Sequence, residues 1–129
     1  MLLRARGFEA AGVRHGFATR RGGVSAGAFA SLNLARDVGD DPDAVAENHA
    51  RLGRALGDAQ LFEVSQVHGE VIHEVGAGDD PALVRAREAD ARIAEGRGVA
   101  IGVRTADCLP LLLADPRAGL VAAVHCGWL

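Results

Sequence analysis

The 129-residue sequence contains no lysine, so all 14 of its basic side chains are arginines. This absence excludes a Schiff-base lysine nucleophile. Cysteine is also scarce, because Cys108 and Cys126 are too few to form the disulfide framework of a small secreted domain. No apolar run is long enough to span a membrane, and residues 1–12 do not resemble a signal peptide. We therefore expect a cytoplasmic protein without a membrane partner.

The charge balance argues against nucleic acid as a partner. The formal net charge is -3, and no basic patch stands out along the chain. The hydrophobic fraction of 49% and the charged fraction of 24% are ordinary for a globular protein. We therefore predict one folded domain over residues 1–129.

One helix is predicted clearly, between Asp41 and Gly57. Asp41 suits the N-cap, Pro42 suits the first helical position, and Gly57 follows the last turn. Its buried face is predicted from positions at helical spacing, Val45, His49, Leu52 and Leu56. Before this helix, residues 12–40 show no persistent period and are expected to form an ordered loop with short strands.

After the helix the pattern favours β-structure. Six strands are expected, near residues 61–67, 71–75, 89–94, 99–104, 110–114 and 120–125. The last two are nearly all apolar, which suits strands that are covered on both faces. The turn at 115–119 contains Pro116 and Gly119, so these two strands should form a hairpin. The predicted fold class is α+β with mixed β-sheets.

Three soft metal ligands stand at the ends of predicted strands. They are His68, Cys108 and His125, and each lies beside a glycine or proline that turns the chain. Two histidines and one thiolate with an open fourth position form a known catalytic zinc pattern. A thiolate favours Zn²⁺, with copper as the alternative, over Mg²⁺ or Ca²⁺. The structural alternative is that these are packed core residues, since free cysteine is among the most buried residue types.

Five motifs in one order resemble the YfiH/laccase-domain family, which is also labelled multicopper polyphenol oxidase. They are HGFATRRGGVS at 15–25, SLNL at 31–34, QVHG at 66–69, TADCLPLLLAD at 105–115 and HCGW at 125–128. The resemblance implies that His68, Cys108 and His125 are zinc ligands. One departure is Cys126, where the family usually has alanine.

The resemblance also implies a fold and an activity. It implies a layered α/β/β/α arrangement, of which this chain supplies about half. Family members continue after the tryptophan for a similar length again, so we expect the chain to be truncated at its C-terminus. The implied function is zinc-dependent purine nucleoside phosphorylase activity on adenosine, inosine and S-methyl-5′-thioadenosine. Adenosine deamination is attributed to the same site.

Three further residues are candidate functional groups. Arg20 lies in a glycine-rich loop and is a candidate phosphate contact, because guanidinium binds phosphate in a bidentate way. Successive backbone N–H groups in such a loop can also form an anion nest. Asn33 is a candidate substrate contact, with satisfaction of the loop backbone as the alternative. Asp107 adjoins Cys108 and is a candidate acid/base, with turn capping as the alternative.

Other functions compete with the phosphorylase. A copper-dependent polyphenol oxidase would need several histidine-rich sites, and the chain has five histidines. A cysteine–histidine hydrolase would use Cys108 as nucleophile and His125 as base. Glu70 with His68 matches half of a nucleobase-deaminase motif, but the cysteine half is missing. Finally, the 129-residue chain could be an inactive fragment.

Overall fold

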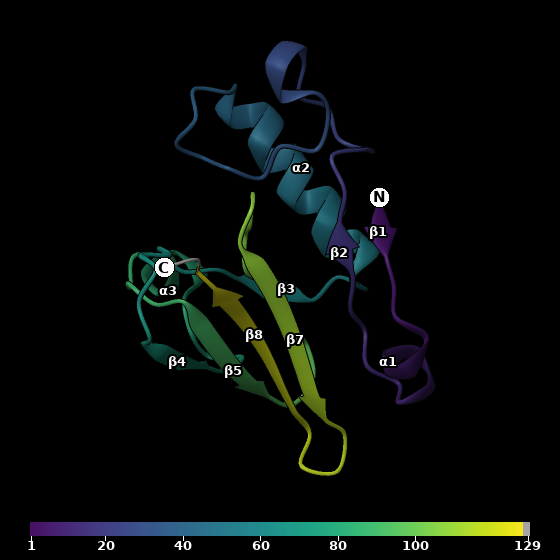
Figure 1. The fold of residues 1–129 in the computed structure, drawn as a ribbon. Helices are drawn as coiled ribbons and strands as arrows, with labels where there is room; N and C mark the ends of the chain where they lie inside the picture. The colour runs from purple at the N-terminus through teal and green to yellow at the C-terminus, as the bar shows by residue number, and fades with distance from the viewer. Residues whose placement is uncertain (128–129) are drawn as a thin grey trace. The chain divides into compact units, whose positions relative to one another are not determined.

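The computed structural model describes residues 1–127 and contains two compact units, Met1–Asp58 and Ala59–Leu129 (Figure 1). Each unit is described by itself. Trp128, the last residue of the fifth motif, lies outside the described residues. Among residues 1–127, no helix is long and apolar enough to cross a membrane.

The first unit contains one long helix and several short elements. Strand β1 (Leu2–Leu3) pairs antiparallel with β2 (Phe17–Ala18), and the short helix α1 (Arg6–Ala10) lies between them in sequence. A 3-10 turn, η1 (Gly27–Phe29), lies in the loop that precedes helix α2 (Pro42–Ala55). The short elements were expected only in general terms, because two to five residues are too few to show a period.

The predicted long helix is confirmed as α2. The Asp41 side chain accepts a hydrogen bond from the N–H of Asp43, and Gly57 follows the helix with a φ of 83°. Val45, Asn48 and Leu52 are its buried residues. His49 is half-buried and its Nε2 lies 3.0 Å from the carbonyl oxygen of Leu34, so it is a packed histidine.

A buried amide attaches the glycine-rich loop to α2. Asn48 is fully buried; its Oδ1 accepts from the N–H of Val24, and its Nδ2 donates to Ser25 Oγ and to the Asn33 carbonyl oxygen. The backbone of Gly23 passes so close to this amide and to the Ser31 carbonyl that a Cβ would lie 2.4 and 2.0 Å from their oxygens. The loop therefore requires glycine at this position.

The second unit contains two sheets. Strands β3 (Gln60–Phe62) and β6 (Val99–Ile101) form a parallel pair. The larger sheet has the order β4 (Ile72–Val75), β5 (Ala91–Glu95), β8 (Leu120–Cys126) and β7 (Leu109–Asp115). Strands β4 and β5 run parallel, and the other neighbours run antiparallel. A short helix, α3 (Pro81–Arg85), completes the unit, and the predicted class of mixed sheets with helices is confirmed.

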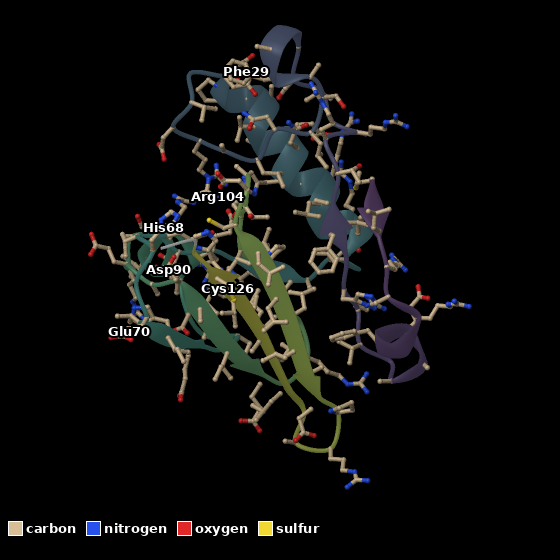
Figure 2. The ribbon with its side chains drawn as sticks, in the orientation of Figure 1. Phe29, His68, Glu70, Asp90, Arg104 and Cys126 are labelled. Atoms are coloured by element: carbon tan, nitrogen blue, oxygen red, sulfur yellow. The ribbon has the colours of Figure 1, made fainter. Side chains whose placement is uncertain are left out.

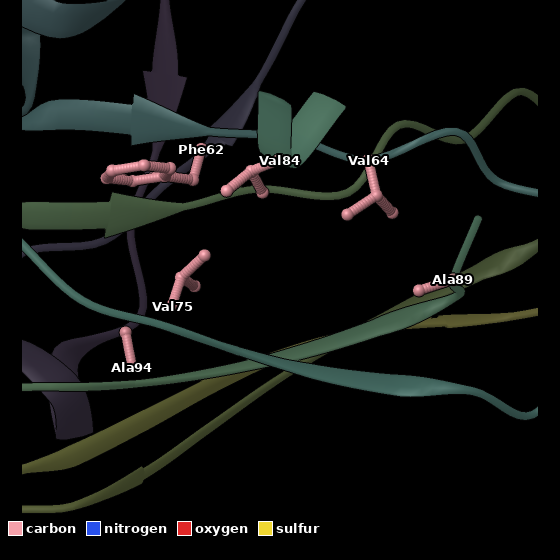
Figure 3. Close-up of a cluster of buried hydrophobic side chains, with 6 residues drawn as sticks. All are labelled: Phe62, Val64, Val75, Val84, Ala89 and Ala94. Atoms are coloured by element: carbon pink, nitrogen blue, oxygen red, sulfur yellow. The ribbon is translucent and has the colours of Figure 1, made fainter. Parts of the chain in front are cut away.

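The core of this unit is small and aliphatic, apart from Phe62. Figure 3 shows its side chains between the segment of β3 and the strands of the larger sheet. The cluster consists of Phe62, Val64, Val75, Val84, Ala89 and Ala94. Buried Arg92 donates from Nη1 to the carbonyl oxygens of Phe62 and Gly102, which ties β5 to the segments of β3 and β6.

Two strands are shorter than predicted. The strand expected at 61–67 ends at Phe62, and the strand expected at 99–104 ends at Ile101. Beyond these points the ladder gives way to an isolated bridge between Ser65 and Glu88 and then to side-chain partners. The N–H groups of residues 67–69 donate to Asp90, and the N–H of Arg104 donates to Gln66. The chain thus leaves the sheet where the candidate metal site begins.

The predicted hairpin is confirmed, but its predicted burial is wrong. Strands β7 and β8 pair from Leu109 opposite Cys126 to Asp115 opposite Leu120. Every second residue of β7 is exposed, with Leu109 at 66%, Leu111 at 41% and Leu113 at 51%. Strand β7 is an edge strand of its sheet, and among the described residues its second face is not covered.

Candidate metal centre

Three ligand atoms meet at one end of the larger sheet. One donor atom each from His68, Cys108 and His125 lies within 4.8 Å of the other two. The Cys108 sulfur is 3.6 Å from Nε2 of His68. The two imidazole rings are nearly perpendicular, with centroids 4.8 Å apart and an interplanar angle of 82°. Residues far apart in sequence therefore converge as the strand-end positions predicted.

Strand pairing brings Cys108 next to His125. In the β7–β8 hairpin Pro110 is opposite His125 and Leu109 is opposite Cys126, so Cys108 directly precedes the last pair of the ladder. Because side chains alternate along a strand, His125 points to the face opposite that of Cys126. His125 is therefore directed to the inner face of the sheet, where it is 5% exposed.

Gln66 joins the loop of His68 to the loop of Cys108. Its Nε2 donates to the Arg104 carbonyl oxygen at 2.7 Å, and its Oε1 accepts from the Arg104 N–H at 2.7 Å. This paired contact resembles one rung of a β-ladder made by a side chain. It fixes the start of the segment that carries Cys108. The sequence pattern predicts no separate role for Gln66.

Gly127 provides the space for the imidazole of His68. A Cβ at Gly127 would lie 2.8 Å from Cδ2 of His68. The ring therefore packs directly on the glycine backbone that follows β8. This close approach explains why a glycine follows the two residues His125 and Cys126 in the motif.

Asp90 is a buried carboxylate beneath the site, next to His68 (Figure 2). Its side chain lies 2.7 Å from Nδ1 of His125 and accepts from three consecutive backbone N–H groups, at residues 67–69. Burial by itself raises the pKa of the Asp90 carboxyl, but the hydrogen bonds from His125 and from the N–H groups of Gly69, Val67 and His68 outweigh it and hold the pKa at about 2. The site thus contains a carboxylate that is ionised at neutral pH.

Cys108 and His68 have the spacing of two ligands on one tetrahedral metal ion. Zinc bonds of about 2.3 Å to sulfur and about 2.0–2.1 Å to nitrogen, at a tetrahedral angle, place the two donor atoms roughly 3.6 Å apart. The distance between Cys108 Sγ and His68 Nε2 is 3.6 Å. His68 is exposed, Cys108 half-buried and His125 buried, so one side of the group is open to solvent. This opening suits a fourth position for water or substrate.

The other predicted residues lie in two places. Asp107 is exposed beside the site, and its Oδ1 is 3.7 Å from the Cys108 sulfur. Arg20 and Asn33 belong to the first unit. Nε and Nη2 of Arg20 both donate to the Ala30 carbonyl oxygen, and Asn33 forms a turn with Ala35 and donates to Asp40.

The backbone donors of the glycine-rich loop are used within the protein. The N–H groups of Gly22 and Gly23 donate to Ser31 Oγ, and that of Val24 donates to Asn48. The N–H of Ser25 donates to the Ser31 carbonyl oxygen. In this structure the loop is therefore a folded scaffold, in which none of these four N–H groups is directed at an external anion.

The fold and the site together define a mixed α/β protein with a two-histidine, one-cysteine group suited to a metal ion. The chain belongs to the family described as multi-copper polyphenol oxidoreductase laccase, whose family model matches residues 14–129.

Relatives of known name support this assignment. The chain is 50% identical over 119 residues to a Deinococcus radiodurans protein named purine nucleoside phosphorylase, covering 90% of this chain and 44% of that protein. A solved Neisseria meningitidis structure is 39% identical with a TM-score of 0.71, covering 84% of this chain and 43% of that one. The solved Bacillus licheniformis protein YfiH is 30% identical with a TM-score of 0.79, covering 88% and 45%. The chain thus spans about half the length of these relatives.

Proposed function

We propose that this chain carries the metal centre of a zinc-dependent purine nucleoside phosphorylase. The observation that carries the proposal is the convergence of His68, Cys108 and His125 within 4.8 Å, in a chain 50% identical to a protein of that name. The proposed reaction transfers the ribosyl group of a purine nucleoside to phosphate, which releases the free base and a ribose 1-phosphate.

Zinc fits the donor set better than copper. The family description mentions several coppers, yet the described residues bring together one group of three ligands. Two imidazoles and one thiolate around an open position form a catalytic zinc set. When bound there, zinc polarises an oxygen of water, substrate or phosphate.

The proposed substrates are adenosine, inosine and S-methyl-5′-thioadenosine together with phosphate, and adenosine deamination is proposed at the same centre. Asp107 is the proposed acid/base: it is exposed at the open side of the site, next to Cys108. Such a carboxylate can exchange a proton with the purine or its leaving nitrogen. The side-chain amide of Asn33 is hydrogen-bonded to Ala35 and Asp40. Asn33 is therefore proposed to assist substrate binding by holding its loop in place rather than by a direct contact.

Arg20 is the proposed phosphate contact. Its side chain is exposed and oriented by two bonds to the Ala30 carbonyl oxygen, which leaves Nη1 as the nitrogen not held by that carbonyl. We expect Arg20→Ala to raise the KM for phosphate at least severalfold with a smaller change in the KM for inosine. Steady-state kinetics with each substrate varied in turn measures this.

Arg21 supplies the matched control for this prediction, since it is the exposed neighbour in the same loop. Arg21→Ala should leave the KM for phosphate close to that of the parent protein. Circular dichroism of both variants checks that the loop change has not unfolded the first unit. An unchanged phosphate KM in a folded Arg20→Ala protein would remove Arg20 from the phosphate site.

The function is tested by a replacement chimera. The matched 119 residues of the Deinococcus radiodurans relative are exchanged for this chain, and hypoxanthine release from inosine is measured with and without phosphate. We expect phosphate-dependent release that requires zinc. A chimera that folds and binds zinc but releases no base, beside an active parent relative, would contradict the proposal.

We expect the 129-residue chain alone to be a weak or inactive enzyme when compared with the chimera. It spans about half of its relatives, and Leu109, Leu111 and Leu113 leave an apolar face of β7 exposed. Such a face favours self-association. The measurement is inosine turnover per mole of bound zinc, with size-exclusion chromatography of both proteins. Equal turnover by a monodisperse short chain would show that residues 1–129 are sufficient.

A cysteine–histidine hydrolase is the second candidate. Two contacts favour it: Asp90 orients the ring of His125, and that ring lies close to the Cys108 thiol. This arrangement matches the nucleophile, base and orienting group of a covalent mechanism. Chelation separates the two candidates, because a cysteine nucleophile remains active without metal, whereas the proposed phosphorylase loses activity and regains it with zinc.

A further inference from the structure

The carboxylate of Asp90 has all of its acceptor positions occupied. Oδ1 accepts from the His68 N–H at 3.0 Å and lies 2.7 Å from Nδ1 of His125. Oδ2 accepts from the N–H groups of Gly69 at 2.7 Å and Val67 at 3.1 Å. Two carboxylate oxygens offer about four lone-pair positions, so four contacts use the full capacity of the group. Asp90 is 2% exposed, and water does not compete for these bonds.

The three backbone contacts fix the conformation of the first histidine. His68 has a φ of 59°, in the left-handed region that few residues other than glycine adopt. A residue other than glycine keeps such a conformation only where the surrounding structure determines it. Here three consecutive N–H groups converge on one carboxylate, as they do around anions in backbone nests. The bonds to Asp90 thus hold the backbone from which the His68 ring projects.

The remaining contact fixes the second histidine. A proton on Nδ1 of His125 is donated to the Asp90 carboxylate, which leaves the lone pair on Nε2 available to a metal. The backbone N–H of His125 also donates to the Asp90 carbonyl oxygen at 2.7 Å. Asp90 therefore holds His125 at two points, one on the ring and one on the strand.

We propose that Asp90 is the positioning residue of the metal centre, a single carboxylate that aims both histidines at one point. This inference rests on the metal centre proposed above and assigns to Asp90 the preorganisation of its nitrogen ligands. Asp90 itself is not a ligand, because its oxygens are occupied by the four contacts. Cys108 completes the centre from the position just before β7, independently of this carboxylate.

The test is Asp90→Asn, which keeps the shape of the side chain. An amide has one acceptor oxygen, so its –NH2 group must face either the N–H groups of Val67 and Gly69 or those of His68 and His125. Loss of an outer-shell partner typically weakens metal binding about 10–100-fold. We expect a Kd for Zn²⁺ raised by that factor, measured by competition with a chromophoric chelator on the full 129-residue chain.

Asp80→Asn is the matched control. Asp80 caps α3 by accepting from the N–H of Ala82, and asparagine caps a helix equally well, so the Kd for Zn²⁺ should not change. Circular dichroism establishes that both variants are folded. An Asp90→Asn protein that folds and binds Zn²⁺ with the parent Kd overturns the proposal.

A second measurement needs neither a variant nor a metal. Nitrogen-15 NMR of the unsubstituted, metal-free protein, at a pH where the imidazoles are neutral, reports which ring nitrogen of His125 carries the proton. We expect the proton on Nδ1. A proton on Nε2 overturns the role of Asp90 even where zinc binds tightly. Conversely, if the proton is on Nδ1 but the protein binds no zinc, the proposed metal centre is contradicted, whereas the contact between His125 and Asp90 is supported.

Discussion

Replacing Cys108 with alanine is expected to abolish tight metal binding. Cys108 supplies the only anionic donor among the three proposed ligands, and its sulfur lies 3.6 Å from Nε2 of His68. Loss of a ligand should weaken Zn²⁺ binding by more than the roughly 100-fold that marks the upper range for outer-shell partners. Competition with a chelator measures the Kd, and Co²⁺ substitution should lose its sulfur-to-metal charge-transfer band.

Cys126 is the matched control for this substitution. It is the second free cysteine, and it lies on the strand position next to His125, with its side chain on the opposite face. Cys126→Ala should therefore keep the metal, the charge-transfer band and any phosphorolysis seen in the chimera. If instead Cys108→Ala retains full zinc affinity, the assignment of the thiolate ligand is wrong.

A single methyl group at Gly23 is expected to destabilise the first unit strongly. A Cβ there would lie 2.0 Å from the Ser31 carbonyl oxygen and 2.5 Å from the Cα of Leu32. Both are backbone atoms, which cannot move aside as the end of a flexible side chain can. Overpacking typically costs about 1–3 kcal/mol, and a clash with backbone falls at the upper end of that range or beyond it. We expect Gly23→Ala to lose about 3 kcal/mol of unfolding free energy.

The same substitution at Gly7 provides the comparison. Gly7 lies in α1, and a Cβ there meets no atom within 4 Å. Alanine is favoured over glycine in a helix by roughly 0.5–1 kcal/mol, so Gly7→Ala should not destabilise the protein. Urea unfolding followed by circular dichroism compares the two variants, and hydrogen exchange at Val24 localises the effect. A Gly23→Ala protein as stable as Gly7→Ala would show that the loop adjusts freely.

Local signals made helix α2 predictable. Asp41 and Pro42 favour a helix start, and Gly57 favours a helix end, through the conformation of adjacent residues alone. Both ends of the helix can therefore be located from the sequence. The β7–β8 hairpin was predictable for the same reason, because its turn lies between two apolar runs. The exposure of Leu111 was not predictable, since a continuous apolar run does not reveal how many faces of its strand are covered.

The ends of β3 and β6 depended on distant partners. The residues after Phe62 continue an apolar pattern through Val64, yet their backbone leaves the ladder for the side chain of Asp90 and for residues around Glu88. No residue within either strand indicates where its backbone leaves the ladder. Strand propensity alone therefore predicts that both strands continue to the next glycine or polar residue, beyond their observed ends.

The convergence of the three candidate ligands was predictable, but the residue that supports them was not. His68, Cys108 and His125 were identified by strand-end placement and by motif resemblance, and the structure brings them together. Asp90 was missed because its partners lie 21 to 35 residues away in sequence. A signal did exist: aspartate is depleted in strands, and Asp90 stands between two alanines inside the strand expected at 89–94. A buried acid in a strand requires a partner.

X-ray absorption spectroscopy at the zinc edge tests the metal centre most directly. Zinc-loaded protein should show one sulfur at about 2.3 Å, together with nitrogen or oxygen neighbours at about 2.0–2.1 Å. Imidazole multiple scattering should indicate two histidines, and the sulfur shell should disappear in Cys108→Ala. A spectrum with only oxygen neighbours, or one unchanged by Cys108→Ala, would contradict a centre formed by His68, Cys108 and His125.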